Sequence, residues 1–515
     1  MSPTTQPESR SAVPRPWRDL RLGAALVLGA LLPLGFAPFE FWWLLPIVVA
    51  AQALTWIDLA PRRAYRVGFG FGAGAFLAGT YWLYHSIVII GKVPLPLALV
   101  LMLGLVAIMA LYYGGVAGVV THFARGRLLP AVLVLHGAWV FYEWGRGWVL
   151  SGFPWLSLGY ALPESAMAGY LPLAGVYGGT LALAGVGAAL LGAAKFRKPL
   201  ERGLSMAGAA AIVLLGFATA RMDWVTPGDR RVSASIGQLG LDQRLKWTQE
   251  AFNETLNWYA NFVAEERGAD VLVMPEAAIP SVADRVTVYL DQLGTTAGAS
   301  GGTLLLGILR RDEQGVYNAL GAFEGRERSW YDKRHLVPIG EIFPVPAFVR
   351  EWMRLRDLPY SDIARGQANP EPLLVAGLPI ATSICYEDAY PAEQLGFFPD
   401  AAFIVNVSND GWFGDSIAPW QHLQIARTRS AESRRWQLRA TNTGVTAIID
   451  GRGRVVDQAP TFEPAVLRGT IETVSGHTPY TRLGNLPALA LRLALIALGA
   501  ALGRRGCAGF QRRGK

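Results

Sequence analysis

Eight long apolar runs constrain the fold of this chain more than any other feature of its sequence. Seven follow one another in the first 224 residues, and the eighth lies near the C-terminal end. Each is close to the ~20 residues that a helix needs to cross a bilayer. Lipid offers no hydrogen-bond partner to an unpaired backbone amide, so such runs must be helical. The predicted spans are Leu20–Phe36, Phe41–Ile57, Val67–Ile90, Pro96–His122, Leu128–Trp148, Met167–Lys195, Gly203–Arg221 and Leu486–Leu502.

Basic residues occur in alternate loops between these runs. Arg62, Arg63 and Arg66 lie between the second and third runs, and Arg125 and Arg127 follow the fourth. Further clusters precede the first run, separate the sixth from the seventh and follow the eighth. Because basic loops stay on the cytoplasmic side, both termini are predicted to be cytoplasmic and the long segment between the last two runs to lie outside. This topology accounts for much of the net charge of +8 without a nucleic-acid partner.

The segment between the seventh and eighth runs has the pattern of a layered α/β domain. Its β-rich runs are Val232–Ile236, Val271–Met274, Thr303–Ile308, Ile380–Ile384, Ala402–Val407 and Thr446–Ile449, with helical stretches such as Trp247–Glu265 and Ser281–Leu293 between some of them. Strands that alternate with helices predict α/β layers. We therefore predict a membrane domain of seven transmembrane helices (1–224), an α/β domain inserted between spans seven and eight (225–482), and an eighth helix with a basic tail (483–515).

A glycine-rich stretch, Gly68–Gly74, loosely matches a nucleotide-binding fingerprint. It follows no strand and lies inside the third apolar run. We interpret these glycines as positions where membrane helices pack closely.

Three residues that can carry chemistry follow β-like runs in the outer segment. Glu276 lies in V-L-V-M-P-E-A-A-I-P, Lys333 in Y-D-K-R-H-L-V-P-I-G-E and Cys385 in T-S-I-C-Y-E-D-A-Y-P. Each alone has a plain alternative: a helix cap, a solvated charge and a small buried hydrophobe. Together they supply a thiol nucleophile, a carboxylate to take its proton and an ammonium to stabilise an oxyanion. Backbone N–H groups from Tyr386 onward would complete an oxyanion hole.

The order of these residues, with P-E-A-A-I-P, K-R-H-L-V-P-I-G-E and I-C-Y-E around them, resembles the nitrilase or carbon–nitrogen hydrolase superfamily. With the eight spans added, the resemblance narrows to the apolipoprotein N-acyltransferase family. The stretches Ser151–Tyr160, Ser408–Arg427 and Ala440–Ala447 are similar to motifs of that family. The resemblance covers nearly the whole chain and implies an αββα sandwich with a Glu–Lys–Cys triad.

The resemblance also implies roles for individual residues. Cys385 is then the nucleophile that forms a thioester with a fatty acyl chain, Glu276 the general base and Lys333 the oxyanion stabiliser. The supporting residues that it implies are Glu341, which orients the lysine, Tyr386 and Glu387 beside the cysteine, Trp247 in a substrate-facing segment, Trp412 in the pocket lining, Asn318 and Arg365.

The implied reaction transfers an acyl chain from a membrane phospholipid, through Cys385, to the α-amino group of the N-terminal diacylglyceryl-cysteine of an apolipoprotein. It needs no cofactor and no metal, and the six histidines contain no H-x-x-x-H pair. The expected partners are the phospholipid, the diacylglyceryl apolipoprotein and the lipid bilayer, with a monomeric enzyme and no nucleic acid. The expected location is the bacterial inner membrane, with the catalytic domain on the periplasmic side.

Two other functions remain open from the sequence. A membrane-tethered amidase of nitrilase type, which hydrolyses a small C–N substrate, would share the three residues but need only one anchoring span. A non-catalytic membrane scaffold with a degenerate domain predicts loss of at least one of the three, and all three are present.

Three groups of residues receive structural interpretations. His335 and His422 are expected to be structural. An aromatic belt at the membrane interface is the interpretation for Trp42, Trp43, Trp148, Trp155 and Tyr160. A mostly solvated helix face is the interpretation for Arg427, Arg429, Arg434, Arg435 and Arg439.

Overall fold

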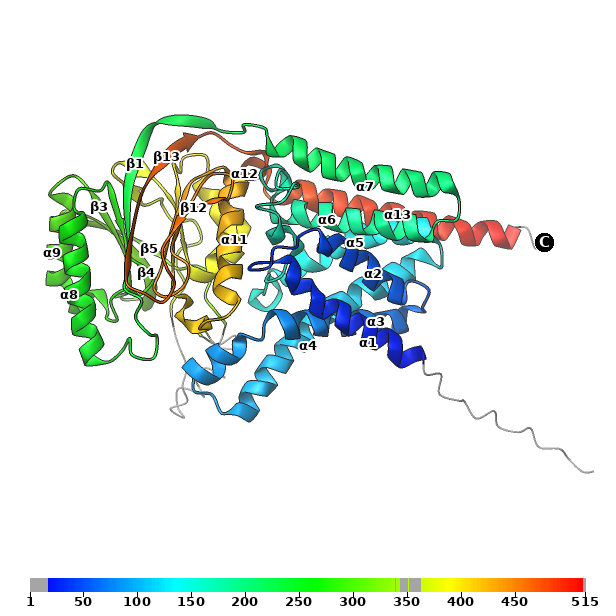
Figure 1. Ribbon diagram of the computed structural model, residues 1–515, viewed down its shortest axis with the longest axis horizontal. Coiled ribbons are helices and arrows are strands. Elements are labelled where there is room, and N and C mark those ends of the chain that lie inside the picture. The colour runs from blue at the N-terminus through cyan, green and yellow to red at the C-terminus, as the bar shows by residue number, and fades with distance from the viewer. Residues whose placement is uncertain (1–16, 339, 343–350, 352–362, 513–515) are drawn as a thin grey trace, which may run out of the picture.

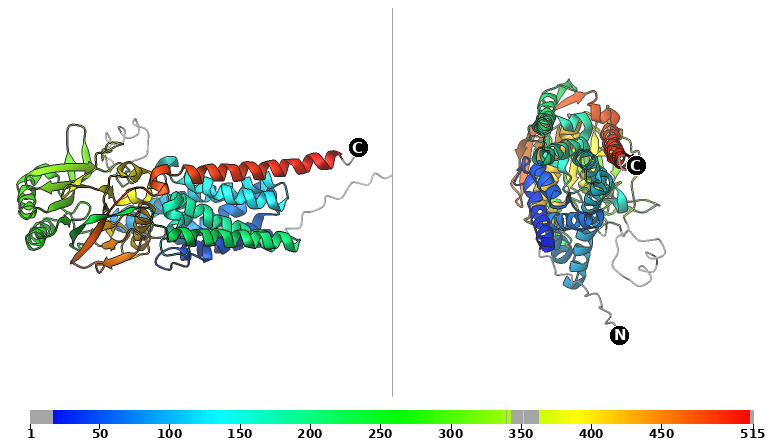
Figure 2. Two further views of the ribbon diagram at one scale, coloured as in Figure 1. Left: turned by 90° about the horizontal axis from the view of Figure 1, so that it is seen from above. Right: turned by 90° about the vertical axis from the view of Figure 1, so that its right-hand side faces the viewer.

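A helical bundle and a layered α/β body lie end to end in the computed structural model, which describes residues 17–512 except 339, 343–350 and 352–362 (Figures 1 and 2). The basic residues before Trp17 and after Arg512 lie outside the described residues. The chain enters the α/β body after α7 (Pro199–Ala220) and returns with α13 (Leu486–Arg512), which packs along the bundle against α5 (Leu128–Arg146).

Among the described residues, a helix occupies each of the eight predicted runs. These helices are α1 (Trp17–Leu31), α2 (Leu44–Trp56), α3 (Pro61–Gly79), α4 (Leu95–Ala124), α5 (Leu128–Arg146), α6 (Tyr170–Lys195), α7 (Pro199–Ala220) and α13 (Leu486–Arg512). Five of them, α4 to α7 and the Leu486–Arg505 part of α13, are long and apolar enough to cross a membrane. Shorter apolar helices cover Leu20–Gly35 and Leu44–Trp56. Several spans are therefore supported, and the number eight stays a prediction.

The third predicted span is divided into two helices. Helix α3 ends at Gly79, and a short π-helix, η2 (His85–Ile90), follows after a bend. At the bend, the Thr80 hydroxyl donates to the Phe76 carbonyl (2.6 Å), a local bond that competes with continued helix. The prediction of one continuous helix over Val67–Ile90 was wrong at this point.

The glycines of α3 lie where neighbouring helices approach closely. A Cβ on Gly74 would lie 2.0 Å from the Leu26 carbonyl oxygen of α1. One on Gly68 would lie 2.6 Å from the Tyr113 carbonyl oxygen of α4. The interpretation of this stretch as a packing motif is confirmed.

Two β-sheets form the centre of the α/β body. One has the strand order β13–β1–β2–β3–β4–β5, and the other has the order β12–β11–β10–β9–β8. The strands are β1 (Thr226–Gln238), β2 (Val271–Val273), β3 (Thr303–Arg311), β4 (Val316–Glu324), β5 (Glu327–Asp332), β8 (Ala381–Ile384), β9 (Ile404–Ser408), β10 (Gln437–Thr441), β11 (Ala447–Ile449), β12 (Val455–Gln458) and β13 (Ala465–Ser475), with a separate hairpin of β6 (Leu374–Val375) and β7 (Leu378–Pro379). The helices are α8 (Gln249–Glu266), α9 (Thr287–Gly298), α11 (Ala418–Ser433) and α12 (Pro479–Leu483).

Alternate side chains of the central strands enter two different cores. Val271 and Val273 of β2 pack with Ile384 and Val407 of the other sheet, whereas Leu272 packs with residues of α8 and α9. A strand buried on both faces reads as a continuous apolar run. Helix α11 packs against the outer face of the second sheet, so the layers are helix, sheet, sheet, helix, as the resemblance implied (Figure 1).

Helix α11 also joins the α/β body to the bundle, because its opposite side packs against α6. The prediction of a solvated arginine face was wrong: the five arginines are at most 9% exposed, and Arg439 lies in β10 rather than in a helix. Arg427 pairs with Glu40 (3.1 Å) and with Glu164, which belong to loops of the bundle. Arg429 pairs with Glu432 (2.8 Å) within α11. A helix between a sheet and a bundle presents its charges to protein rather than to water.

A break in α6 strengthens this junction. The helix is interrupted at Ala174 and Gly175, which have non-helical backbone angles. The Val176 N–H, which follows the break, donates to Glu432 Oε1 of α11 (2.6 Å). A carboxylate of the α/β body therefore satisfies a backbone group of the bundle.

Trp155 and Tyr160 lie at the same junction, so the aromatic-belt prediction was wrong for these two residues. They are 1% and 2% exposed. The Trp155 Nε1 donates to Gln421 (2.6 Å), and the Tyr160 hydroxyl donates to the Ala389 carbonyl (2.8 Å). Both rings serve the contact between the bundle and the α/β body instead of facing lipid.

Candidate active site

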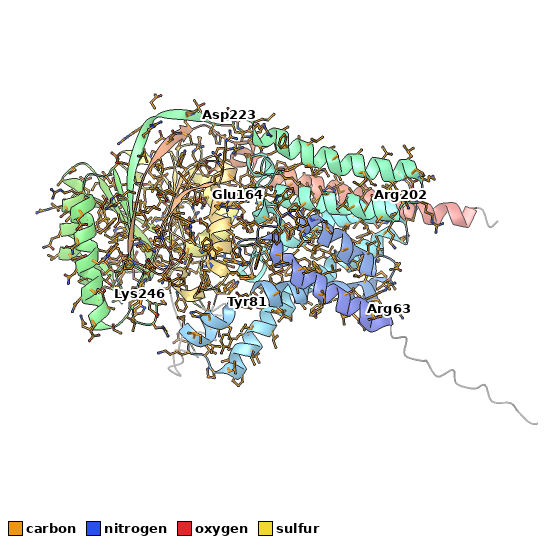
Figure 3. The ribbon with its side chains drawn as sticks, in the orientation of Figure 1. Arg63, Tyr81, Glu164, Arg202, Asp223 and Lys246 are labelled. Atoms are coloured by element: carbon orange, nitrogen blue, oxygen red, sulfur yellow. The ribbon has the colours of Figure 1, made fainter. Side chains whose placement is uncertain are left out.

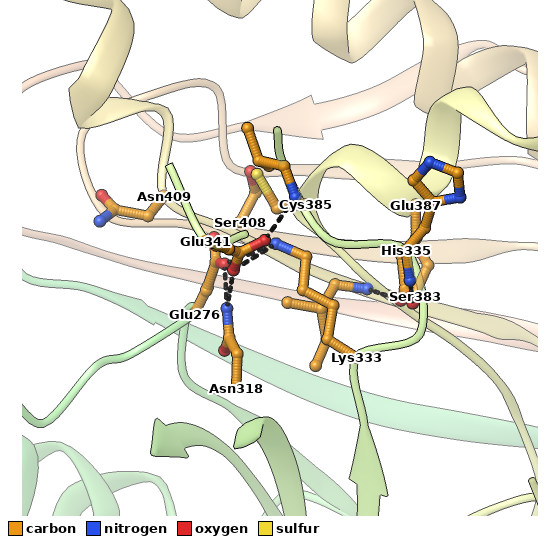
Figure 4. Close-up of polar contacts among 12 residues, drawn as sticks. Glu276, Asn318, Lys333, His335, Glu341, Ser383, Cys385, Glu387, Ser408 and Asn409 are labelled. Atoms are coloured by element: carbon orange, nitrogen blue, oxygen red, sulfur yellow. Dashed lines mark hydrogen bonds and ion pairs between the residues drawn. The ribbon is translucent and has the colours of Figure 1, made fainter. Parts of the chain in front are cut away.

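Three strand ends bring the predicted catalytic residues together. Glu276 follows β2, Lys333 follows β5, and Cys385 follows β8 as the first residue of the short helix η6 (Cys385–Ala389). Lys333 Nζ lies 3.3 Å from Glu276 Oε1, and Figure 4 shows the Cys385 sulfur beside this pair. Lys333 is 1% exposed and Glu276 is 7% exposed. Because β2 and β5 belong to one sheet and β8 to the other, the site lies where the two sheets meet.

A second carboxylate and an amide surround Lys333. Glu341 Oε1 lies 2.9 Å from Lys333 Nζ, and Glu341 Oε2 accepts from the Val337 N–H (2.8 Å). Asn318 Nδ2 donates to Glu276 Oε1 (2.7 Å) and to Glu341 Oε1 (2.8 Å). The Asn318 carbonyl also accepts from the Lys333 N–H (2.8 Å). Asn318 thus holds both carboxylates around the lysine (Figure 4).

The charges of this group keep the lysine protonated and the thiol neutral. Burial lowers the pKa of Lys333, but Glu276 and Glu341 outweigh it and raise that pKa well above its usual range. Burial raises the pKa of the Cys385 thiol, Glu276 raises it further, and Lys333 opposes them. The thiol must therefore give its proton to a neighbouring base as it attacks.

Cys385 has a left-handed backbone conformation, with φ of 53°. A residue other than glycine keeps this conformation only where its surroundings hold it. The sharp turn starts η6 directly after β8, so the first N–H groups of η6, beginning at Tyr386, have no partner within the helix. N–H groups in this position are suited to bind an oxyanion that forms next to the sulfur.

Glu387 ties the cysteine turn to the segment after β5. Its carboxylate is 1% exposed and accepts from the N–H groups of Ile384 (2.8 Å), Arg334 (2.6 Å) and His335 (3.1 Å). It also accepts from the Tyr331 hydroxyl (2.8 Å). Because it binds residues next to both catalytic candidates, Glu387 fixes their separation.

The bundle contributes two backbone carbonyls to the site. The hydroxyls of Tyr386 and Tyr390 donate to the Gly152 carbonyl (3.2 and 3.0 Å). His335 Nε2 lies 2.9 Å from the Ser151 carbonyl, and its ring stacks on Tyr390 with centroids 3.4 Å apart. The residue directly after the nucleophile is therefore positioned by a loop of the bundle, and His335 has the structural role that was expected.

Three predicted supporting residues are exposed rather than buried with this group. Trp247 is 60% exposed, Trp412 is 39% exposed, and Arg365 is also exposed. Among the hydrogen bonds and ion pairs of the described residues, none joins these side chains to Glu276 or Lys333. The structure thus does not bring them to the buried centre, and their roles stay predictions.

Lys246 is a charged residue of the site that the sequence analysis missed. It is 2% exposed, and its Nζ lies 3.5 Å from the Glu276 carbonyl oxygen. Figure 3 shows where this residue lies in the α/β body. Burial lowers the pKa of Lys246 to about 8, and the charge of Glu276 opposes this. The sequence signal was its place beside Trp247, but a lysine in a polar stretch reads as a surface charge.

A buried polar network behind Cys385 was also missed. Asp410 opens the short helix η8 (Asp410–Phe413) and accepts from Arg439 Nη2 (2.9 Å), and its Oδ1 lies 2.7 Å from His422 Nδ1. Burial raises the pKa of Asp410, but His422 and Arg439 lower it to about 2. Asp410 and His422 both lie in the Ser408–Arg427 stretch, but Arg439 belongs to β10, so the fold is needed to bring the three side chains together. Among the described residues, no group of three or more His, Cys, Asp or Glu side chains could hold a metal ion.

Two family models match this chain. The apolipoprotein N-acyltransferase N-terminal domain matches residues 28–189, and the carbon-nitrogen hydrolase model matches residues 233–477. A curated apolipoprotein N-acyltransferase of Nitrosomonas europaea is 38% identical over 94% of this chain and 98% of its own. One of Methylococcus capsulatus is 36% identical over 95% and 97%. A solved CN-hydrolase superfamily protein of Xanthomonas campestris, with an arsenic adduct in its active site, is 18% identical over 51% of this chain and 97% of its own, with a TM-score of 0.35.

Proposed function

Because this chain belongs to the apolipoprotein N-acyltransferase family, we propose that it carries an acyl chain from a membrane phospholipid to an apolipoprotein through a thioester on Cys385. The acceptor is the α-amino group of the N-terminal diacylglyceryl-cysteine. The observation that carries the proposal is the buried Lys333, held between Glu276 and Glu341 beside the free thiol of Cys385.

The proposal places the protein in the bacterial inner membrane, with the α/β body in the periplasm and both termini in the cytoplasm. Arg63 and Arg202 lie at the end of the bundle away from the α/β body, whereas Glu164 and Asp223 lie at the end next to it (Figure 3). Basic residues at the far end support this orientation, because basic loops stay cytoplasmic.

In the first half-reaction, the Cys385 sulfur attacks the ester carbonyl carbon of the phospholipid. Glu276 takes the thiol proton as the S–C bond forms. The negative charge that develops on the carbonyl oxygen is stabilised by the Lys333 ammonium and the Tyr386 N–H. The C–O bond to glycerol then breaks, and Glu276 returns the proton to the leaving oxygen of the lysophospholipid.

In the second half-reaction, the amine of the apolipoprotein attacks the thioester carbonyl. Glu276 takes a proton from the attacking nitrogen, and the C–S bond breaks after the C–N bond has formed. The thiolate receives that proton, so the enzyme returns to its starting state. The ester and then the thioester provide the free energy.

The reaction requires a membrane-embedded bundle, because both substrates lie in the bilayer. Moving an acyl chain into water costs about 0.8 kcal/mol per methylene. Trp148 and Leu150, which directly precede the Ser151–Gly152 contact, are 55% and 75% exposed. These apolar side chains offer the donor chain a surface next to the site, so it need not enter water.

The test uses the purified full-length protein in detergent, incubated with a phospholipid of known acyl mass. We expect one acyl chain on the Cys385 peptide, removable by hydroxylamine, with release of an equal amount of lysophospholipid. The adduct should be absent in Cys385→Ala and present in Cys507→Ala, which removes the only other cysteine. Addition of a diacylated lipopeptide should then discharge the adduct.

A folded wild-type sample that gives neither adduct nor lysophospholipid would contradict the phospholipid donor. Hydrolysis of a small amide by that same sample would favour the amidase instead.

A further inference from the structure

A buried histidine lies directly beneath the cysteine turn, and the reaction steps above do not use it. His422 belongs to α11 and is 1% exposed. Its Nδ1 lies 2.7 Å from Asp410 Oδ1, and its Nε2 lies 3.2 Å from the carbonyl oxygen of Cys385. The ring therefore bridges an acidic side chain and the backbone of the proposed nucleophile.

Both neighbours of this ring are hydrogen-bond acceptors. The Cys385 carbonyl oxygen can only accept. Asp410 already receives hydrogen bonds from Ser408 (2.9 Å) and Arg439 (2.9 Å), which fits the ionised, acceptor-only form. For both contacts of His422 to be hydrogen bonds, both ring nitrogens must carry a proton, and only the imidazolium has two.

We propose that His422 is held as an imidazolium and positions the oxyanion-binding N–H of Tyr386 through the peptide group that joins Cys385 to Tyr386. The proposal rests on the thioester reaction proposed above. The His422 N–H donates to the carbonyl of this peptide, and the N–H of the same peptide faces the forming oxyanion. A charge-assisted hydrogen bond to the carbonyl polarises the peptide and makes its N–H a stronger donor.

The same contact helps to hold the left-handed conformation of Cys385, whose φ of 53° needs support from outside the turn. A neutral donor would give weaker support, because hydrogen bonds from charged donors are shorter and stronger.

The charges that face the ring come from several elements. Asp410 of η8 contacts it directly, and Arg439 of β10 contacts the other oxygen of Asp410. Asp388 of η6 lies 3.6 Å from Arg439, so the cations are balanced by nearby carboxylates. Trp155 of the bundle packs near the imidazole, with ring centroids 5.9 Å apart. This enclosed arrangement keeps water away from the ring.

The first test is His422→Gln, which can keep a donor but loses the positive charge. We expect thioester formation on Cys385 to slow by about 10-fold or more, since removal of one oxyanion donor costs more still. In the acyl-enzyme, the infrared stretch of an isotope-labelled thioester carbonyl should move to higher frequency, because a weaker oxyanion hole polarises it less. The matched control is His477→Gln, which changes a histidine near α12 and should leave rate and frequency unchanged.

The outcomes separate this inference from the proposed function. If wild type forms no thioester, the proposed function fails. If wild type forms it and His422→Gln matches both its rate, within about 3-fold, and its carbonyl frequency, the His422 inference is overturned.

A second measurement covers the case in which His422→Gln does not fold. The structure describes all six histidines. Among them, only His335 resembles His422 in having a hydrogen-bond acceptor at each ring nitrogen. In a His335→Gln protein labelled with nitrogen-15 at histidine, we expect one ring in which both nitrogens carry a hydrogen-bonded proton, as the two acceptors of His422 require. Absence of such a ring would overturn the proposal.

Discussion

At the scale of single residues, the Asn318 amide separates two carboxylates that would otherwise repel each other. Its one nitrogen donates to both Glu276 and Glu341, and Lys333 lies between the same two groups. The group contains one ammonium and two carboxylates, and the amide gives the carboxylates further hydrogen-bond donors without changing the net charge.

Asn318→Asp should therefore abolish most of the activity. The change replaces two donated hydrogen bonds with a third carboxylate, so we expect thioester formation to fall by about 100-fold or more. The rate of acyl adduct formation on Cys385 measures the effect. Asn257→Asp makes the same chemical change on the exposed face of α8 and should have no effect. Equal rates for the two variants would contradict the assigned role of Asn318.

Lys246 gives a prediction about stability and pH. Its folded-state pKa of about 8 lies below its unfolded value, so burial of the charge opposes folding wherever both states are protonated. This cost is complete below about pH 8, and it disappears as pH rises through the unfolded value of about 10.4.

Lys246→Met should consequently raise the melting temperature at neutral pH. The upper limit of the gain is on the order of 3 kcal/mol, the energy equivalent of the pKa shift. Thermal unfolding in detergent across a pH series measures it, and the gain should shrink at alkaline pH. Lys198→Met removes an exposed lysine and should show no such pH dependence. A lower melting temperature for Lys246→Met at neutral pH would show that the ammonium stabilises the fold.

At the scale of elements, Glu387 couples the start of η6 to the segment after β5. Each of its two oxygens accepts a hydrogen bond from a backbone N–H group, from Arg334 at one oxygen and from Ile384 at the other. A backbone N–H group can only donate, so it needs an acceptor at this position. A glutamine in either orientation would turn an NH₂ group toward a donor.

Glu387→Gln should lower both stability and activity. An unsatisfied buried donor costs about 1–3 kcal/mol, and the loosened segment would let Lys333 move relative to Cys385. Thermal unfolding and the rate of acyl adduct formation, measured well below the melting temperature, report the two effects. Glu254→Gln on the exposed face of α8 is the matched control. Loss of stability with an unchanged rate would show that Glu387 does not position the two catalytic candidates.

The sequence predicted elements best where apolar residues are continuous. The eight apolar runs and the strands β2, β3 and β9 are of this kind, because burial on both faces or in lipid leaves no polar positions. Strand β13 was missed because polar residues such as Arg468 and Glu472 point outward at alternate positions. The break between α3 and η2 lies at Thr80, whose hydroxyl bonds to the Phe76 carbonyl, and hydropathy does not show such local bonds.

The residues of the candidate site also differ in how far the sequence could predict them. The grouping of Glu276, Lys333 and Cys385 could be predicted, because each follows a strand and the motifs resemble a known family. Lys246 and His422 could not, since their importance depends on burial by segments distant in the sequence. A charge that faces water and one that faces another domain look alike in sequence.

At the scale of the whole molecule, α11 determines how the α/β body sits on the bundle. Glu432 joins the two halves, because it accepts from Val176 after the break in α6 and pairs with Arg429. Removal of this carboxylate would leave a buried cation and a backbone N–H without their partner.

Glu432→Ala should destabilise the protein by about 3–5 kcal/mol, the usual cost of breaking a buried ion pair. A lower melting temperature in detergent is the expected readout. Glu265→Ala, at an exposed position of α8, should melt like wild type. If the two variants melt together, Glu432 does not contribute to the stability of the junction.

The contacts of Tyr386 and Tyr390 with the Gly152 carbonyl have a consequence for recombination between relatives. The loop that precedes α6 is encoded with the bundle, whereas the two tyrosines that it contacts are encoded with the α/β body. A hybrid that joins the first seven helices of one species to the remainder of another would inherit a mismatched lining around its thiol. A hybrid in which residues 148–160 and the α/β body come from the same parent would keep the Gly152 loop together with the tyrosines that it contacts. A hybrid joined only at the border between the two domains would separate them.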